Sequence, residues 1–415
     1  MSKINVKTCA APDTICRWED INFHLAEKRV KKLQLRIAKA RNEGNSQKVL
    51  NLQHKLIHSF YAKALAVKIV TTNKGKHTPG VDGIVWRTPE DKWQAISELN
   101  RRGYKPKPLD RVYIPKPGGG LRPLGIPTMK DRAMQTLYKL ALEPVAEVTA
   151  DLHSYGYRHS RCARNAIIRC ADILSDSPGF VWVLEADIKS CFDNISHEWV
   201  LEHVPMDRDT LRKFLTIGYV ENKKPYPVEK GIPQGGSISP IICNMVLDGL
   251  ENVLKDRFCA DVHFIRYADD FIVIGEDKDI LERSVAPLIN DFLSERGLEL
   301  SPDKTVVTHV RNGFDFLGWH VFDNGWRLII TPSERSVTSL LGKIEGVLIR
   351  DPHDTPEKLY KALRPIVVGW LNYHRGVVIE YSLYDVEYDV ISLINRLTEG
   401  RALCPLINQL FRLRK

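Results

Sequence analysis

The sequence predicts an α+β fold built around an antiparallel sheet and preceded by basic helices. Two observations lead to this prediction. Short β-rich runs occur in pairs joined by turns, and they are interleaved with helical patterns instead of forming regular βαβ units. Positive charge is concentrated in the helical patterns that precede the first of these pairs. With 415 residues, the chain is long for one core and fits two or three domains.

Composition argues against several other classes of protein. Hydrophobic residues make up 43% and charged residues 27% of the chain, which are ordinary values for a globular protein. No run approaches the roughly 20 apolar residues that cross a bilayer, and no apolar run follows the first lysines, as a signal peptide requires. We expect a cytoplasmic protein without membrane contact. The eight cysteines form no close CxxC pair, which argues against a zinc ribbon or a disulfide framework.

The N-terminal region, residues 22–73, is expected to form two helices. Val30, Leu33 and Ile37 recur at helical spacing, and a second apolar series follows at Leu52 and Leu56. Between the two series, residues 42–45 read Asn-Glu-Gly-Asn, which predicts a break in the helix.

This N-terminal region is also strongly basic. Residues 23–68 contain eleven Lys or Arg and two Glu, a net charge of +9 that equals that of the whole chain. A solvated helix face is the simpler interpretation, but so large an excess of one sign is costly by self-repulsion and is better explained by a polyanionic partner. We therefore expect RNA binding in this region by Lys28, Arg29, Lys31, Lys32, Arg36 and Lys39.

Strands and turns dominate the middle of the chain. Residues 80–83, with the sequence Gly-Val-Asp-Gly, predict a turn, and residues 111–115 and 121–126 predict two strands around the glycine-rich turn 116–120. A helix is expected over 130–149 and a strand over 180–188. A hairpin is expected over 263–275, with acidic residues at its turn. Further on, the pattern predicts a helix over 279–296, strands over 314–320 and 326–330, and helices beyond 333.

Acidic residues at two strand ends carry the functional prediction. Asp187 ends an apolar strand, and Asp269 and Asp270 interrupt the apolar hairpin. A single acid in apolar sequence is usually a strand-end or cap residue, but two such places in one chain suggest a shared role. Their carboxylates would repel one another unless a divalent ion lay between them. Mg²⁺ prefers carboxylate oxygens together with phosphate oxygens of a substrate.

Two such ions, about 3.5–4 Å apart, stabilise the attacking and leaving oxygens of an in-line phosphoryl transfer. We therefore expect two Mg²⁺ ions, for which Mn²⁺ could substitute. Asp187 and Asp269 are expected to bridge them, with Asp270 as an auxiliary ligand.

Seven motifs resemble those of reverse transcriptases, and the match is closest to enzymes encoded by bacterial group II introns. The similarity covers about residues 20–380 and includes the basic extension and the Gly-Val-Asp-Gly turn. The seven motifs, in the order of the family, are Arg122-Pro-Leu-Gly-Ile-Pro127, Ser154-Tyr-Gly-Tyr-Arg158, Asp187-Ile-Lys-Ser-Cys-Phe192, Pro233-Gln-Gly-Gly-Ser-Ile-Ser-Pro240, Tyr267-Ala-Asp-Asp270, Phe314-Asp-Phe-Leu-Gly318 and Gly369-Trp-Leu-Asn-Tyr-His-Arg375.

The resemblance implies a right-hand polymerase with fingers, a palm that contains the antiparallel sheet, and a helical thumb. It places a basic helical extension at residues 1–75, fingers and palm at 76–335, and the thumb with a short tail at 336–415. It also implies an RNA-directed DNA polymerase that uses dNTPs, a primer–template, and a structured RNA template or non-coding RNA. The oligomeric state is left open.

Individual roles follow from the same resemblance. Phe192 would be a steric gate under the incoming sugar, and a core phenylalanine is the simpler alternative. Lys116 and Arg122 would contact the triphosphate. In an unrelated protein, the same two residues would simply belong to an ordinary charged hairpin. Gln234 and Gly235 would lie near the nascent base pair.

Further residues receive roles in this way. Ile188 is counted with the metal ligands beside Asp187. Lys304 would protonate the leaving pyrophosphate, although a solvated lysine is common at such a place. A primer grip would be formed by Phe316, Leu317 and Gly318.

The sequence also departs from the family pattern. Leu121 replaces a basic residue expected before Arg122, which would weaken a triphosphate or template contact. Only about forty residues follow the last motif, without a His/Cys cluster, so we do not expect a metal-dependent endonuclease. This departure favours a domesticated host enzyme with a dedicated RNA, for example in antiphage defence, over intron mobility.

Two other functions compete with reverse transcription. An RNA-dependent RNA polymerase shares the palm and its metals, but Phe192 argues against it because the ring would collide with a 2′-hydroxyl. An intron maturase, which is an RNA-splicing cofactor, fits the basic N-terminal region and does not need the acids. Splicing and polymerase functions can also coexist in one chain.

Overall fold

A computed structural model describes residues 15–115, 120–176, 179–350 and 355–398, together with residues 407, 408 and 411. The chain divides into two compact units whose segments alternate along the sequence. The first comprises Met1–Leu152, Ile188–Val253 and Ile289–Leu300, and the second comprises His153–Asp187, Leu254–Leu288 and Ser301–Lys415. Helices interleaved with antiparallel strand pairs confirm the predicted α+β class.

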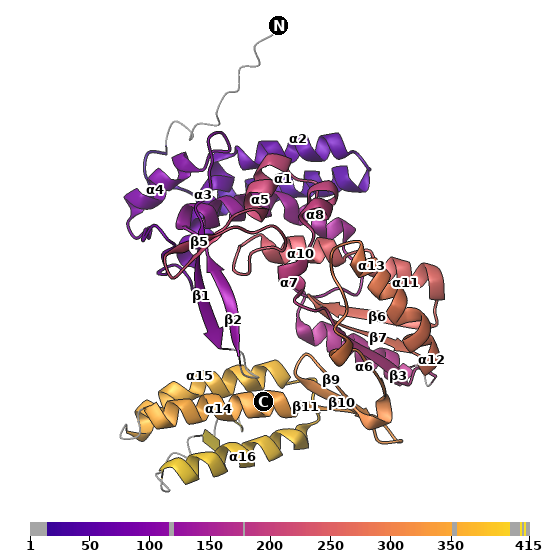
Figure 1. Ribbon diagram of the computed structural model, residues 1–415. Helices are drawn as coiled ribbons and strands as arrows, with labels where there is room; N and C mark the ends of the chain where they lie inside the picture. Colours follow the sequence, from indigo (N-terminus) through magenta and orange to yellow (C-terminus); the bar gives the residue numbers. More distant parts are fainter. Residues whose placement is uncertain are drawn as a thin grey trace. The chain divides into compact units, whose positions relative to one another are not determined.

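The first unit begins with helices that pack against one long helix, α5 (Figure 1). Val30 and Ile37 of α1 are buried, so the apolar spacing predicted from the sequence marks its inner face. The helices of this unit are η1 (Trp18–Asp20), α1 (Phe23–Asn42), α2 (Ser46–Ile57), α3 (Phe60–Thr72), α4 (Pro89–Glu98), α5 (Met129–Thr149), α7 (Cys191–Asn194), α8 (His197–His203), α9 (Arg208–Leu215) and α10 (Ser239–Leu247).

The N-terminal region contains three long helices where two were predicted. The expected break after Asn42 is present, but the second predicted helix is divided at His58 and Ser59. Ser59 is extended (φ −70°, ψ 127°) and its carbonyl accepts the first hydrogen bond of α3, from the amide of Lys63 at 3.1 Å. The apolar spacing continues across this break, so periodicity alone could not reveal it.

Four strands form the sheet of the first unit, in the order β2-β1-β4-β5. The first two make the antiparallel hairpin expected around residues 116–120, of which 116–119 lie outside the described residues. β1 also pairs with β4 in parallel, which the sequence did not predict. The strands are β1 (Leu109–Pro115), β2 (Leu121–Ile126), β4 (Tyr219–Glu221) and β5 (Lys224–Tyr226).

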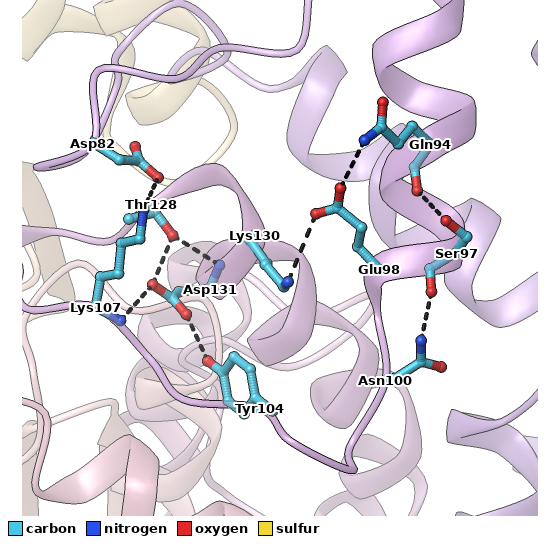
Figure 2. A network of polar contacts seen from close by, with 10 residues as sticks. All are labelled: Asp82, Gln94, Ser97, Glu98, Asn100, Tyr104, Lys107, Thr128, Lys130 and Asp131. Carbon is cyan, nitrogen blue, oxygen red and sulfur yellow. Dashed lines mark hydrogen bonds and ion pairs between the residues drawn. The ribbon is translucent and has the colours of Figure 1, made fainter.

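A buried polar network connects the start of α5 to the loops before it (Figure 2). The Asp131 carboxylate accepts hydrogen bonds from the hydroxyls of Tyr104 (2.7 Å) and Thr128 (2.6 Å) and from the amide of Lys107 (3.2 Å). The Lys107 ammonium forms an ion pair with Asp82 of the Gly-Val-Asp-Gly turn at 3.3 Å. Burial raises the pKa of Asp131, and the hydrogen bonds oppose that rise. The network therefore fixes the turn against the helix.

The second unit is built on a four-stranded antiparallel sheet in the order β6-β7-β3-β8. Helix α6 packs against it, and Ile167, Cys170, Val183 and Ile272 are part of one buried apolar cluster. The elements are α6 (Ala163–Asp176), β3 (Trp182–Asp187), β6 (Val262–Tyr267), β7 (Asp270–Gly275), η3 (Pro302–Lys304) and β8 (Val306–His309).

Two predicted elements are interrupted in the structure. The strand expected over 314–320 is broken because Leu317 and Gly318 take left-handed conformations (φ 52° and 84°), which turn the chain back into an antiparallel pair. The helix expected over 279–296 contains a π-helical turn. The segments are α12 (Lys278–Ile280), η2 (Leu281–Val285), α13 (Ala286–Ser294), η4 (Val310–Asn312), β9 (Phe314–Phe316), β10 (Trp319–Asp323) and β11 (Leu328–Pro332). The last strand begins two residues later than predicted, with Trp326 exposed in the preceding turn.

Three long helices follow, as the sequence predicts beyond residue 333. The helices pack against one another (Figure 1). Their apolar core includes Leu340, Ile344, Leu363 and Val390. They are α14 (Glu334–Arg350), α15 (Pro356–His374) and α16 (Glu380–Thr398), and the remaining helix is α11 (Leu250–Phe258). Across the described residues, every helix is too short or too polar to cross a membrane.

The Asp131 network gives a prediction about stability. Asp131→Ala leaves the buried Tyr104 hydroxyl without its acceptor, and we expect a loss of about 1–3 kcal/mol in the free energy of unfolding, measured by chemical denaturation. Asp172→Ala, at an exposed position of α6, is the control and should change the stability by less than about 0.5 kcal/mol. Equal effects of the two variants would contradict a structural role for the network.

Candidate active site

The acids singled out in the sequence lie together at one end of the β6-β7-β3-β8 sheet. Asp187 is the last residue of β3 and Asp270 the first of β7, and the two face each other directly in the antiparallel register. Asp269 and Ala268 form the turn between β6 and β7, with Ala268 left-handed (φ 59°). The hairpin with acids at its turn is therefore present, and strand pairing brings Asp187 to it.

The hairpin turn is supported from behind by the segment around Gly156. The amide of Tyr155 donates to the carbonyl of Arg266 (2.8 Å), and the amide of Arg266 donates to the carbonyl of His153 (2.9 Å). A Cβ at Gly156 would lie 2.3 Å from the backbone nitrogen of Ala268. Only glycine permits this approach, so residue 156 sets how close the supporting segment lies to the acidic turn.

The carboxylates interact unfavourably in the absence of a cation. Loss of hydration, followed by the negative charges of Asp269 and Asp187, raises the pKa of Asp270 to about 6. The positive charges of Arg335 and Lys304 oppose this rise. Asp270 lies at the end of β7, an interior strand of the sheet, and is exposed to solvent, so water and salt weaken the repulsion without removing it.

Lys304 is the counterion of Asp187 in this structure. Its ammonium lies 2.8 Å from Asp187 Oδ2, and its side chain is otherwise largely exposed. Among the described residues, no group of three or more His, Cys, Asp and Glu side chains is arranged as a complete metal site. Three neighbouring carboxylates, two of which help raise the pKa of Asp270, nevertheless suit a divalent ion, because hard cations prefer carboxylate oxygen.

Ile188 follows Asp187 directly and belongs to the first unit. Its side chain is buried, and its backbone forms an isolated bridge with Leu300. Since isoleucine has no polar side chain, only its carbonyl oxygen could bind a metal.

Phe192, Gln234 and Gly235 lie close together in the first unit. Phe192 and Gln234 line a cavity of about 330 Å³, whose walls also include Arg111 of β1 and Gly125 of β2. The Gln234 side-chain amide donates to Asp193 Oδ1 at 3.2 Å, which fixes its direction. Phe192, the predicted steric gate, and the loop that contains Gln234 therefore line the same cavity.

Gly235 is placed where no other residue fits. Its φ is 108°, and a Cβ would lie 2.5 Å from the carbonyl oxygen of Gly125. The amide of Gly125 in turn donates to the carbonyl of Gln234 at 2.8 Å, which joins the loop to β2. Arg122, on the same strand, is exposed, whereas Lys116 lies outside the described residues.

The turn between β9 and β10 is held by α15, the second of the three long helices that follow it. The Tyr373 hydroxyl donates to the carbonyl of Leu317 at 2.8 Å, and its ring stacks on Trp319 with centroids 4.5 Å apart. The carbonyl of Gly318 accepts from the amide of Ser333 at 3.0 Å. Phe316, the remaining residue expected to form the grip, is buried beneath the turn.

Sequence reasoning did not assign a role to Tyr373, although the residue lies in a motif that it identified. The motif Gly369–Arg375 could have indicated such a role, because it contains more aromatic and histidine side chains than one helix face needs for packing. In the structure, Ser336 Oγ lies 3.0 Å from both Trp370 Nε1 and His374 Nε2. Burial lowers the pKa of His374 to about 4, so its ring is neutral at pH 7 and can accept this hydrogen bond.

Comparison with known sequences agrees with this arrangement. Residues 114–321 match the model of the family described as reverse transcriptase (RNA-dependent DNA polymerase), and residues 18–99 match that of the N-terminal domain of reverse transcriptase. The chain is 32% identical to Protein YkfC of Escherichia coli (strain K12), over 61% of this chain and 78% of the relative.

Two further relatives are encoded in introns. The putative COX1/OXI3 intron 2 protein of Saccharomyces cerevisiae is 24% identical, over 82% of this chain and 50% of its own length. The group II intron-encoded protein LtrA of Lactococcus lactis is 26% identical, over 82% of this chain and 67% of its own length. The chain thus spans from half to nearly four fifths of these relatives.

The contact of Tyr373 with the β9–β10 turn gives a second prediction. Tyr373→Phe removes the hydrogen bond to Leu317 and keeps the ring stacking, so we expect amide hydrogen exchange at residues 317–319 to become about five-fold faster, as for a change of about 1 kcal/mol. Tyr388→Phe, at an exposed position of α16, is the control. Unchanged protection of the turn in Tyr373→Phe would show that Trp319 and Ser333 hold it alone.

Proposed function

Since the chain belongs to the reverse transcriptase family of RNA-dependent DNA polymerases, we propose that it copies RNA into DNA with two divalent metal ions bound by Asp187, Asp269 and Asp270. The observation that carries this proposal is the direct pairing of Asp187 with Asp270 across β3 and β7. Mg²⁺ is the expected ion and Mn²⁺ a possible substitute. The division into a basic extension (1–75), fingers and palm (76–335) and thumb (336–415) stays a prediction.

The acids and Lys304 have distinct parts in this proposal. When bound, two divalent ions stabilise the attacking primer oxygen and the leaving phosphate oxygens. Asp187 and Asp269 would supply the main carboxylates that hold the ions, Asp270 an auxiliary one, and Ile188 its backbone carbonyl. The Lys304 ammonium, 2.8 Å from Asp187, would donate a proton to the departing pyrophosphate.

Selection of the sugar is assigned to Phe192. The ring is half-buried at the wall of the 330 Å³ cavity, so it presents a fixed surface to a ligand there. A 2′-hydroxyl on the incoming nucleotide would collide with the ring, whereas a deoxyribose would not. Gln234 and Gly235 border the nascent pair, and Lys116 and Arg122 contact the triphosphate.

The primer is assigned to the β9–β10 turn formed by Phe316, Leu317 and Gly318. Two backbone carbonyls of this turn are held by Tyr373 and Ser333, so its shape does not depend on a bound nucleic acid. A turn that is fixed in advance loses little entropy when a primer binds.

The structured RNA is assigned to the exposed face of α1. Lys28, Lys32, Arg36 and Lys39 follow one another at helical spacing of three or four residues and are all exposed, as are Arg29 and Lys31. Like charges at this spacing destabilise a helix, and phosphate groups would remove that cost. This is our reason for preferring RNA binding over a solvated face.

The biological role has two candidates. Relatives encoded in introns favour a maturase that also reverse-transcribes its intron. A domesticated enzyme in antiphage defence, acting in the cytoplasm with a dedicated non-coding RNA, stays a prediction from the sequence. Sequencing the RNA that copurifies with the protein distinguishes them, since intron RNA supports the first and an unrelated non-coding RNA the second.

The polymerase proposal is tested on the acids. Asp269→Asn combined with Asp270→Asn keeps their shape and removes two charges, so we expect dNTP incorporation to fall by about 10²- to 10³-fold or more, with RNA binding retained. The measurement is extension of a DNA primer on an RNA template with Mg²⁺. Asp261→Asn, an exposed acid just before β6, is the control. Undiminished extension by the double variant would refute the proposal.

The sugar gate is tested separately. Phe192→Val opens space for a 2′-hydroxyl, so we expect kcat/KM for a ribonucleotide to rise by about ten-fold or more while that for the matching dNTP changes little. Steady-state incorporation of CTP and dCTP measures the ratio. Phe180→Val, a buried phenylalanine of the second unit, is the control for removal of a core ring. An unchanged ratio in Phe192→Val would place selection elsewhere.

The basic face of α1 is tested by salt dependence. Replacing Lys28, Arg29, Lys31 and Lys32 with Gln should weaken binding of a long folded RNA and reduce the log–log salt slope by about 0.7–0.9 for each phosphate that the protein no longer neutralises. Extension of a short primer–template should change much less. Lys278→Gln with Arg283→Gln, where both cations pair with neighbouring acids, is the control. An unchanged slope in the α1 variant would favour a solvated helix face.

A further inference from the structure

A second cavity, of about 410 Å³, lies in the first unit between α2, α5 and the residues that lead into α9. It is separate from the cavity of Phe192 and shares no lining residue with it. Its apolar walls come from Leu50, Ile57, Ala141 and Met206. A volume of this size is typical of pockets that bind small molecules.

One cation at this cavity is fixed in place. Arg101 donates through Nε to Asp207 Oδ2 at 2.9 Å, and its Nη2 lies 2.5 Å from Asp207 Oδ1. Asp207 is in turn held as the N-cap of α9, where it accepts from the amide (3.1 Å) and hydroxyl (2.6 Å) of Thr210. Within the described part of the chain, Nη1 of Arg101 makes no hydrogen bond. A guanidinium oriented in this way, with one donor group unused, is suited to an anion.

Two imidazole rings lie beside this cation. His54 lines the cavity, and its ring lies 4.1 Å from that of His58, with 33° between their planes. Burial, and then the positive charges of His58 and Arg101, lower the pKa of His54. A neutral imidazole offers a flat surface on which another ring can stack. Arg208 adds a second, exposed cation to the same lining.

The cavity therefore combines apolar walls, a flat ring, two arginines and the Asp207 carboxylate that holds one of them in place. The walls, the ring and the arginines are the features that a base, a sugar and a phosphate require together. We propose that this cavity binds one nucleotide, with its base against the apolar walls and His54 and its phosphate at Arg101 and Arg208.

The source of the nucleotide is either an unpaired residue of bound RNA or a free nucleoside phosphate. α2, which supplies much of the cavity wall, follows α1, to which we have assigned RNA binding, and this part of the inference rests on that proposed function. The chemistry of the cavity itself does not depend on the polymerase proposal, because none of its residues is assigned to catalysis.

The experiment measures nucleotide binding to the full chain by two routes. Isothermal titration with the four nucleoside 5′-monophosphates, and with inorganic phosphate for comparison, tests free nucleotides. Photocrosslinking of an RNA that carries 4-thiouridine in an unpaired loop, followed by peptide mapping, tests RNA. We expect saturable binding of at least one monophosphate that is at least ten-fold tighter than that of phosphate, or a crosslink to residues 50–57, 138–141 or 206–208.

Three variants test the location of the site. Leu50→Trp covers the cavity from an exposed position, Ala141→Leu fills it, and Arg101→Gln removes the fixed cation. Each should weaken binding or reduce crosslinking at least ten-fold, while extension of a short primer–template continues. Ile69→Trp, at an equally exposed position of α3, is the control.

Binding by either route that these variants weaken supports the proposal, and the route identifies the source of the nucleotide. Absence of both saturable binding and crosslinks in a chain that still extends a primer overturns it. Binding that persists in Leu50→Trp and Ala141→Leu also overturns it, because the nucleotide would then lie elsewhere. An inactive chain that still binds nucleotides in this way would count against the polymerase proposal alone.

Discussion

Repulsion between three carboxylates at one end of the β6-β7-β3-β8 sheet is the constraint around which the second unit is arranged. The antiparallel ladder of β3 and β7 holds Asp187 and Asp270 opposite each other, and the turn adds Asp269. The strands beneath are buried and apolar, which gives the sheet enough stability to keep like charges close together. Lys304 and Arg335 reduce the repulsion without removing it, because the charges of Asp269 and Asp187 still add to the effect of burial in raising the pKa of Asp270. A site whose carboxylates repel one another is stabilised more by a bound cation than a site without such repulsion would be.

Much of this arrangement could be predicted from residue pattern. The strand over 121–126 has the bounds that the sequence indicates, and the turn of the acidic hairpin lies where two apolar runs meet two acids. Long-range pairing could not be derived this way, since nothing local states that Asp187 lies opposite Asp270. The breaks at Ser59 and at Leu317 were missed for a related reason. Serine commonly begins helices and Gly318 favours left-handed angles, but both residue types also occur inside regular elements, so the tertiary structure decides whether the chain breaks there.

The motifs that the sequence analysis identified by resemblance differ in what they do physically. Some residues present chemical groups, as Asp187 does, whereas others hold a neighbouring backbone in place, as Tyr373 does for Leu317. Gln135 belongs to the second kind, because its side-chain oxygen accepts the amide of Ser237 at 2.8 Å and so supports the loop that carries Gln234. A residue of this second kind is recognised from its neighbours in space rather than from its type. This explains why residue chemistry found the acids but not the groups that position the turns.

The close approach of Gly156 to Ala268 has a consequence for how this protein can change during evolution. At most positions, a series of side chains of increasing size allows a structure to adjust in small steps. At residue 156 no such series exists, because even the first carbon would lie 2.3 Å from the nitrogen of Ala268. The distance between the supporting segment and the acidic turn therefore cannot drift gradually through residue 156. Substitutions in related sequences can change the position of the acidic turn only through its other neighbours. The distance between residue 156 and Ala268 therefore stays the same for as long as the hairpin is retained.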